Sequence, residues 1–132
     1  MPNQAHSIAI ERAVHTFDAK GATLGRLATR AALVLRGKHK VNFELNKDCG
    51  DYVVIENAKD IVVTGNKLEQ KMYYSHTGFP GGLHEMQLRT LMEKAPEKVI
   101  ERAIYGMLPK NKLRSLWMRR LTIHAGEKVA GR

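Results

Sequence analysis

The chain has 132 residues, 43% of them hydrophobic, and its 22 Lys and Arg side chains against 13 Asp and Glu give a formal net charge of +9. This length and apolar content favour one folded domain and exclude a wholly disordered chain, while the positive charge favours a nucleic-acid partner over a basic protein whose charge only keeps it in solution. Because Cys49 is the single cysteine, an internal disulfide is excluded, and we interpret Cys49 as an incidental thiol. We find no apolar run as long as a membrane span and no secretory-signal pattern.

Two elements are predicted at the start of the chain, after a loose arm at residues 1–12. The alternating segment 13–19 is typical of a short strand. A helix follows, with Thr23 as its N-cap and Gly37 as its stop. Apolar side chains recur along this helix at helical spacing, at Leu24, Leu27, Ala28, Ala31 and Leu35.

Three strands are predicted in the middle of the chain. The continuous β-rich run within residues 51–58 predicts a strand that is buried on both faces, as in a parallel sheet. Residues 60–64 and 70–76 are predicted to form two short strands, joined around Gly65–Asn66, which is a favourable turn pair.

The last part of the chain is predicted to hold two helices and a short strand. A glycine-rich loop at 76–84 precedes a helix over about 84–94. A second helix begins at Pro96, since proline is favoured in the first helical turn. Residues 121–125 then predict a last short strand, and residues 127–132 form a short tail.

The order of these elements indicates the fold class. Strands that alternate with helices are typical of α/β domains. We therefore expect a single domain over residues 13–126, with a small, mainly parallel sheet and helices packed on both of its faces.

The residue types that commonly carry catalysis or bind metals follow no recognised spacing here. Gly21, Gly25 and Arg26 do not form a phosphate-binding loop, and Gly25 is interpreted as a point of close approach. The six histidines form no HxxxH or HExxH pair, so we expect no metal, no other cofactor and no enzymatic activity. Asp48 and Asp51 flank a glycine before a strand, where a turn and a strand cap explain them as well as an acid–base couple does.

Several clusters of cations share one sign of charge and favour binding to phosphates. Cations, small polar groups and backbone N–H groups contact phosphates, and glycine lets the backbone approach them. An aromatic content of 6% argues against a protein that stacks on single strands and favours duplex or folded RNA. The candidate RNA-binding residues are Arg36, Lys38, His39, Lys40, Asn66, Lys67, Lys71, His76, Thr77, Gly78, Lys110, Lys112, Arg114, Arg119 and Arg120.

The segment 106–121 mixes five cations with large apolar side chains and holds no acidic residue. We expect its cations to face RNA phosphates and its apolar members to fix it to the domain, because rigid anchoring reduces the entropy lost on binding. The expected anchors are Met107, Leu108 and Trp117. The alternative is an amphipathic helix whose basic face is solvated.

The sequence resembles a known family in seven segments that occur in the family's order. They are "DAKGATLGRLAT", "LRGKHK", "GDYVVIENA", "VTGNK", "YYSHTGFPGG", "PEKVIERAIYGMLPKNKL" and "RRLTIHAG". Over about residues 14–126 the chain is similar to the large-ribosomal-subunit protein 13 family of the bacterial type.

This resemblance implies a non-catalytic α/β domain that binds large-subunit ribosomal RNA and helps that subunit assemble. It further implies neighbouring large-subunit proteins as partners, no membrane association, no homo-oligomer, and a place in a cytoplasmic ribosome, with an organellar ribosome as the alternative. The residues that it assigns to RNA are Lys38, His39, Lys40, Asn66, Lys67, His76, Thr77, Gly78, Lys110, Lys112, Arg119 and Arg120.

The chain departs from the family's pattern in one motif and at its ends. Arg114–Ser115 stands where the family commonly has Gly–Arg, the arm is atypical and the tail is short. A free-standing regulatory RNA-binding module is the second hypothesis for the function. A small phosphotransferase is disfavoured, because the phosphate-binding loop is missing.

Overall fold

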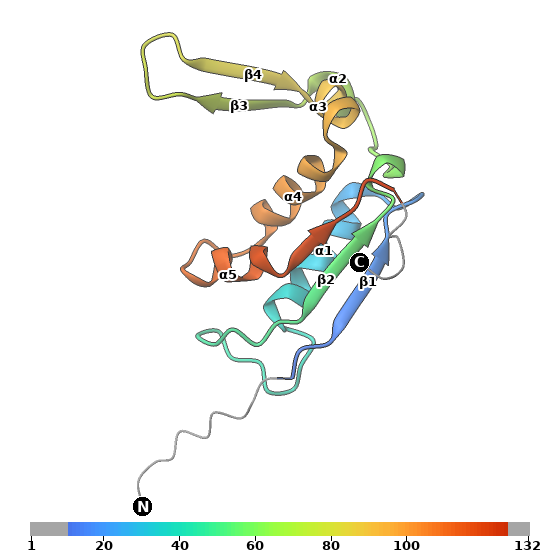
Figure 1. Ribbon diagram of the computed structural model, residues 1–132, viewed down its shortest axis with the longest axis vertical. Helices are drawn as coiled ribbons and strands as arrows, with labels where there is room; N and C mark the ends of the chain where they lie inside the picture. The colour runs from blue at the N-terminus through green and yellow to red at the C-terminus, as the bar shows by residue number, and fades with distance from the viewer. Residues whose placement is uncertain (1–10, 127–132) are drawn as a thin grey trace, which may run out of the picture.

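The computed structural model describes residues 11–126, so most of the predicted arm and all of the predicted tail at 127–132 lie outside the described residues. The described part folds into one α/β domain (Figure 1). In chain order its elements are β1 (Val14–Asp18), α1 (Leu24–Arg36), β2 (Tyr52–Glu56), the 3-10 helix η1 (Ala58–Asp60), α2 (Lys67–Gln70), β3 (Met72–His76), β4 (Leu83–Gln87), α3 (Leu88–Lys94), α4 (Pro96–Met107), α5 (Leu113–Arg119) and β5 (Leu121–Ile123).

Strands β1, β2 and β5 form a parallel sheet in which β2 is central. The register places Val53 beside His15 of β1 and beside Leu121 of β5. Three successive residues of β2, Val53, Val54 and Ile55, are buried. The continuous apolar run therefore forms the central strand, as predicted, with residues 53–55 buried and its first residue, Tyr52, exposed.

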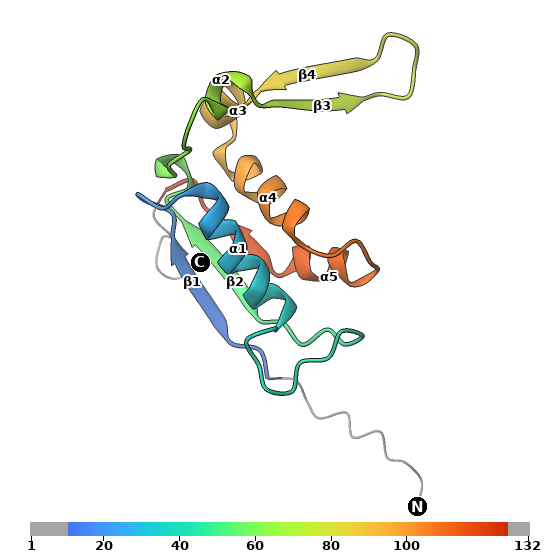
Figure 2. The same ribbon diagram turned by 180° about the vertical axis from the view of Figure 1, so that it is seen from behind.

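Helices α1 and α4 pack against each other on the same face of the sheet (Figures 1 and 2). Their buried stripes meet in one core that includes Leu27 and Leu35 of α1 and Ile100 and Ile104 of α4. The predicted start of α4 at Pro96 is confirmed.

The α/β class and the mainly parallel sheet are confirmed, whereas the predicted helical cover is found on one face of the sheet. Within residues 11–126 the opposite face presents Thr16, Tyr52 and Thr122, and all three are exposed. Polar and exposed side chains on that face agree with a sheet whose apolar side packs against α1 and α4.

The predicted limits of α1 are confirmed at its C-terminal end, where Gly37 adopts a φ of 82° and stops the helix. Thr23 does stand at the N-cap, but its side chain makes no capping hydrogen bond. The backbone of Thr23 instead pairs with Val62 in an isolated β-bridge. This bridge is the β-structure found within 60–64, so the predicted strand there is wrong.

The turn at Gly65–Asn66 is confirmed, but it leads into a helical turn and not into a second strand. Gly65 has a φ of 68°, and the carbonyl of Asn66 accepts hydrogen bonds from the N–H groups of Glu69 and Gln70. Residues that favour helices follow the turn, which explains α2.

The antiparallel hairpin of the structure pairs β3 with β4, so the predicted partner strand is wrong. The register runs from Met72 opposite Gln87 to His76 opposite Leu83. The helix expected over 84–94 consequently begins at Leu88. Both views show the hairpin projecting away from the sheet and its helices (Figures 1 and 2).

No helix within residues 11–126 combines the length and the apolar content that crossing a bilayer requires.

Candidate nucleic-acid interface

Arg120, which follows α5, is buried and does not face solvent. Its guanidinium forms a two-pronged ion pair with Asp48, in which Nη1 lies 2.6 Å from Oδ2. Nη2 also donates a hydrogen bond of 3.3 Å to the backbone carbonyl of Leu35. This cation is thus already paired inside the fold, and its contact with RNA stays a prediction.

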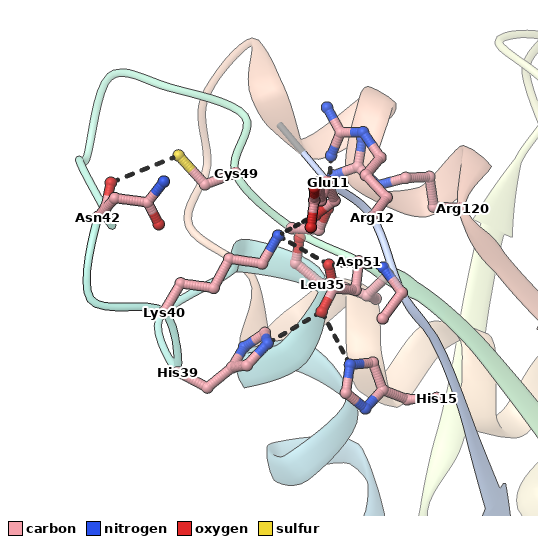
Figure 3. A network of polar contacts seen from close by, with 12 residues as sticks. Glu11, Arg12, His15, Leu35, His39, Lys40, Asn42, Cys49, Asp51 and Arg120 are labelled. Atoms are coloured by element: carbon pink, nitrogen blue, oxygen red, sulfur yellow. Dashed lines mark hydrogen bonds and ion pairs between the residues drawn. The ribbon is translucent and has the colours of Figure 1, made fainter. Parts of the chain in front are cut away.

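The buried carboxylate of Asp51 draws three basic side chains together (Figure 3). Its Oδ2 lies 2.8 Å from Nε2 of His15 and 3.0 Å from Nε2 of His39. Its Oδ1 lies 2.8 Å from Nζ of Lys40 and accepts a hydrogen bond of 3.2 Å from the N–H of Ala13. His39 and Lys40 were predicted to contact RNA, and both are now tied to the fold by Asp51.

Both aspartates carry a lowered pKa. Burial alone would raise the pKa of Asp51, but hydrogen bonds from Lys40 and His15 outweigh it and hold that pKa well below the usual value. Burial likewise opposes the shift at Asp48, where the ion pair with Arg120 prevails and lowers the pKa. The two carboxylates therefore act as anionic anchors for the loop between α1 and β2, and the acid–base couple is not needed to explain them.

Cations at the end of α1 and along the segment around α5 form what we call the α1–α5 surface. Lys38, Lys110, Lys112 and Arg119 are exposed. The full set is Arg36, Lys38, Lys110, Lys112, Arg114 and Arg119.

Two half-buried arginines of the α1–α5 surface lie on aromatic rings. The guanidinium of Arg36 lies 5.7 Å from the ring centre of Phe43. That of Arg114 lies 3.7 Å from the ring centre of Tyr105, and it also donates a 2.6 Å hydrogen bond to the Tyr105 hydroxyl. Such stacking holds the cation in place while leaving its charge intact.

A hollow of about 450 Å³ lies between α1 and the end of α4. Helix α5 also contacts α1, which places the basic segment around α5 beside α1. The lining residues are Thr29, Ala32, Leu33, Arg36, Lys38 and Met107.

Buried side chains fix the α5 segment to the domain, as predicted for two of the three proposed anchors. Leu108 and Trp117 are 3% and 2% exposed. Met107, by contrast, is 43% exposed, and its Sδ accepts a 3.3 Å hydrogen bond from the hydroxyl of Thr29. The anchoring role expected for Met107 falls instead to Arg120 and its partner Asp48.

The remaining predicted residues lie on α2 and on the hairpin, and we call them the hairpin surface. Its members are Asn66, Lys67, Lys71, His76, Thr77 and Gly78, and all of them are exposed.

The hairpin tip has a defined turn geometry. Nδ1 of His76 accepts a 2.9 Å hydrogen bond from the N–H of Gly78, which adopts a φ of 86°. The N–H of Thr77 donates to the carbonyl of Gly82 at 3.1 Å. Glycine at a positive φ makes this turn accessible without strain.

The structure does not gather the predicted residues into one patch. The hairpin projects beyond one end of α4, and α5 lies beyond the other end (Figures 1 and 2). The candidate interface consequently consists of two separate surfaces that are held at a fixed spacing by α4.

Sequence reasoning missed the aromatic side chains of the hairpin. Tyr74 is 62% exposed and Phe79 is 73% exposed, while Tyr73 is half-buried under the guanidinium of Arg102 at 4.9 Å from its ring centre. The low total aromatic content concealed them, although a phenylalanine within a glycine-rich loop is a signal of an exposed ring. Exposed rings of this kind stack on unpaired bases.

A group of potential metal ligands is present, although no sequence spacing predicted one. One ligand atom each from His15, His39 and Asp51 lies within 4.8 Å of the others. The three residues come from β1, from the loop after α1 and from the residue just before β2. Such a set is invisible to any search for closely spaced ligands.

The chain is similar to known proteins over most of its length. A family model described as "Ribosomal protein L13" matches residues 12–130. A protein named "Large ribosomal subunit protein uL13" from Clostridioides difficile (strain 630) is 56% identical over 117 residues, which are 89% of this chain and 82% of the relative. Proteins of the same name from Desulfitobacterium hafniense (strain DSM 10664 / DCB-2) and Alcanivorax borkumensis are each 51% identical, over 93% and 89% of this chain and 86% and 82% of theirs.

Proposed function

The chain belongs to the ribosomal protein L13 family, and on this premise we propose that its α1–α5 surface and its hairpin surface are the parts that bind large-subunit ribosomal RNA. As a family member it is a structural constituent of the large ribosomal subunit and not an enzyme. Its ribosome is of the bacterial type, in the cytoplasm, and its role is to bind ribosomal RNA and to support subunit assembly.

The observation that carries this proposal is the anchoring of exposed cations beside buried side chains. Lys110 and Lys112 are exposed, while Leu108 before them and Trp117 after them are buried. A cation on a fixed backbone loses less entropy on binding than one on a mobile loop. Each contact with a phosphate also releases counterions, which favours binding at low salt.

The hairpin surface supplies a second kind of contact. The exposed cations Lys67 and Lys71 suit the phosphate backbone, and the exposed ring of Phe79 suits an unpaired base. Because the hairpin projects from the domain, it can reach RNA that does not touch the α1–α5 surface. We propose that the two surfaces bind separate RNA segments and so fix their relative position during assembly.

We also propose that the chain occurs as one copy per subunit, with neighbouring large-subunit proteins as its other partners. The exposed far face of the sheet, with Thr16 and Tyr52, offers such proteins a surface that carries no member of the two basic surfaces. Cross-linking in intact subunits, followed by mass spectrometry, identifies the proteins in contact with that face.

Sucrose-gradient sedimentation of a cell extract tests the proposal. We expect a tagged chain to sediment with large subunits, and a variant with Lys38, Lys110 and Lys112 changed to Ala to shift towards the free fractions. A free-standing regulatory RNA-binding module would stay in the light fractions in both cases. Sedimentation of the variant with large subunits to the same extent as the parent chain would overturn the proposed placement of the RNA-binding surfaces.

A further inference from the structure

We propose that His15, His39 and Asp51 form a binding site for one divalent transition-metal cation, with Zn²⁺ as the probe. Their ligand atoms already lie within 4.8 Å of one another. Two imidazoles and a carboxylate are a donor set that suits Zn²⁺, with a further position left for water. None of the three residues is a member of the α1–α5 surface or of the hairpin surface, and the site uses imidazoles and a carboxylate where those surfaces use cations.

The carboxylate of Asp51 is oriented for this role by its other contacts (Figure 3). Oδ1 is held by Nζ of Lys40 at 2.8 Å and by the N–H of Ala13 at 3.2 Å. These two bonds leave Oδ2 directed at the imidazoles. Groups that hydrogen-bond to a ligating carboxylate fix its orientation and are a regular part of metal sites.

Little rearrangement separates the present geometry from coordination. Oδ2 lies 2.8 Å from Nε2 of His15 and 3.0 Å from Nε2 of His39. Ligands at about 2.0–2.1 Å from a tetrahedral Zn²⁺ are about 3.3 Å apart, so each Nε2 needs to move away from Oδ2 by only a few tenths of an ångström. The ligand nitrogens of the two histidines already lie within 4.8 Å of each other. His15 and His39 are 34% and 30% exposed at their side chains, and Asp51 is 3% exposed, so the cation can enter from the histidine side.

Binding of the cation requires one proton to change its position within each of the two imidazole rings. Each imidazole must present a bare Nε2 to the cation, so each carries its proton on Nδ1. Without the cation, the same Nε2 atoms donate N–H groups to Oδ2. The positive charge of Lys40 beside Oδ1 weakens the attraction for the cation, and we therefore expect binding in the micromolar range or weaker.

Isothermal titration of the full, untagged chain with ZnCl₂ tests the site. We expect one cation per chain, and an affinity at least about tenfold lower in His15→Gln and in His39→Gln, since loss of a ligand should cost no less than loss of a group that orients one. His84→Gln is the matched control, because His84 is an exposed histidine on another strand. Its affinity should equal that of the parent chain.

Co²⁺ absorption provides a second measurement that reports the ligands themselves. We expect visible bands from a bound Co²⁺ that disappear in His15→Gln and persist in His84→Gln, with all three proteins melting near the same temperature. Absence of saturable binding, or equal binding by the parent and both site variants, would show that the cluster is a hydrogen-bond network and no metal site. RNA binding is not measured in either experiment, so their failure leaves the proposed function untouched.

Discussion

Arg120 and Asp48 lie 72 residues apart in the sequence and form a two-pronged ion pair in the fold. Because Nη2 of Arg120 also bonds to the carbonyl of Leu35, three segments meet at one guanidinium. They are the end of α1, the loop before β2 and the turn between α5 and β5. This contact fixes the two basic segments of the α1–α5 surface relative to each other.

We predict that Arg120→Ala destabilises the fold by about 3 kcal/mol, because it leaves the carboxylate of Asp48 without its main partner. Arg119→Ala removes the same charge from an exposed neighbour and should change the free energy of unfolding by no more than about 0.5 kcal/mol. Urea unfolding of both variants gives the two values. Equal losses would contradict the structural role of Arg120.

We predict that Lys38→Ala, Lys110→Ala and Lys112→Ala together weaken binding to large-subunit RNA and flatten its salt dependence. Each lost phosphate contact lowers the slope of log K against log salt by about 0.9 on a duplex. Filter binding at several salt concentrations measures both effects.

The control for this triple variant changes three exposed lysines outside the two surfaces, Lys20, Lys59 and Lys94, to Ala. Net charge falls equally in the two proteins, so any difference in slope reports the location of the cations. If both triple variants lose the same affinity, the charge acts as a whole and the α1–α5 surface has no special role.

We predict that Trp117→Ala costs about 3–5 kcal/mol, because a 2% exposed indole leaves a large cavity when it is truncated. Leu116→Ala, at a 38% exposed position on the same helix, should cost far less. Thermal melting compares the two. A Trp117→Ala protein that keeps its stability and loses RNA binding would instead make the indole a stacking surface.

We predict that stability falls in acid and that Asp48 contributes to this fall. The folded pKa of Asp48 lies below its usual 3.8, so its contribution is complete above that value and is lost as the pH drops through the folded pKa. Urea midpoints between about pH 5 and pH 2 should therefore decline less steeply in Asp48→Asn than in the parent chain. Glu93→Gln, at an exposed position, should follow the parent curve.

We predict opposite effects for alanine at two glycines. A Cβ at Gly50 would lie 1.6 Å from the carbonyl oxygen of Leu35, so Gly50→Ala should cost about 3 kcal/mol or prevent folding. At Gly25, within α1, no other part of the described chain lies within 4 Å of an added Cβ, and alanine should stabilise the helix by about 0.5–1 kcal/mol.

Melting temperatures of the two glycine variants check this contrast. The sequence was interpreted as needing a close approach at Gly25, and the fold itself makes none there. If Gly25→Ala melts higher and binds RNA less tightly, the close approach is made by RNA. Unchanged RNA affinity would contradict that interpretation.

Elements with strong local signals could be predicted from the sequence. Gly37, in the left-handed conformation, ends α1, and Pro96, in the first helical turn, begins α4. The β-branched run at 53–55 forms the central strand. In each case the physical cause lies within a few residues of the element.

The hairpin could not be predicted, because its cause is not local. Val62 and Val63 favour a strand but find no partner strand beyond one bridge, whereas 83–87 contains residues that suit a helix. Residues 83–87 form a strand and not a helix because they pair with β3, and a strand is stabilised by its cross-strand contacts.

The roles of individual cations were equally hidden. Arg119 and Arg120 are identical in chemistry and adjacent in sequence, yet one is exposed and the other is buried. The distant partners Asp48 and Leu35 of Arg120 distinguish them. The members of the hairpin surface are exposed without the help of a distant partner, so their exposure could be expected from the sequence, and their contact with RNA stays a prediction.

The sheet topology has a consequence for the order of events during synthesis. β5 ends at residue 123 and pairs with the central β2, so the sheet lacks its third strand until residue 123 has left the translating ribosome. Nascent chains emerge from the N-terminus, and pairing across long separations is slow. We expect ribosome-bound chains that stop before Arg120 to remain protease-sensitive around residues 38–50, with protection arising abruptly once the last strand is free.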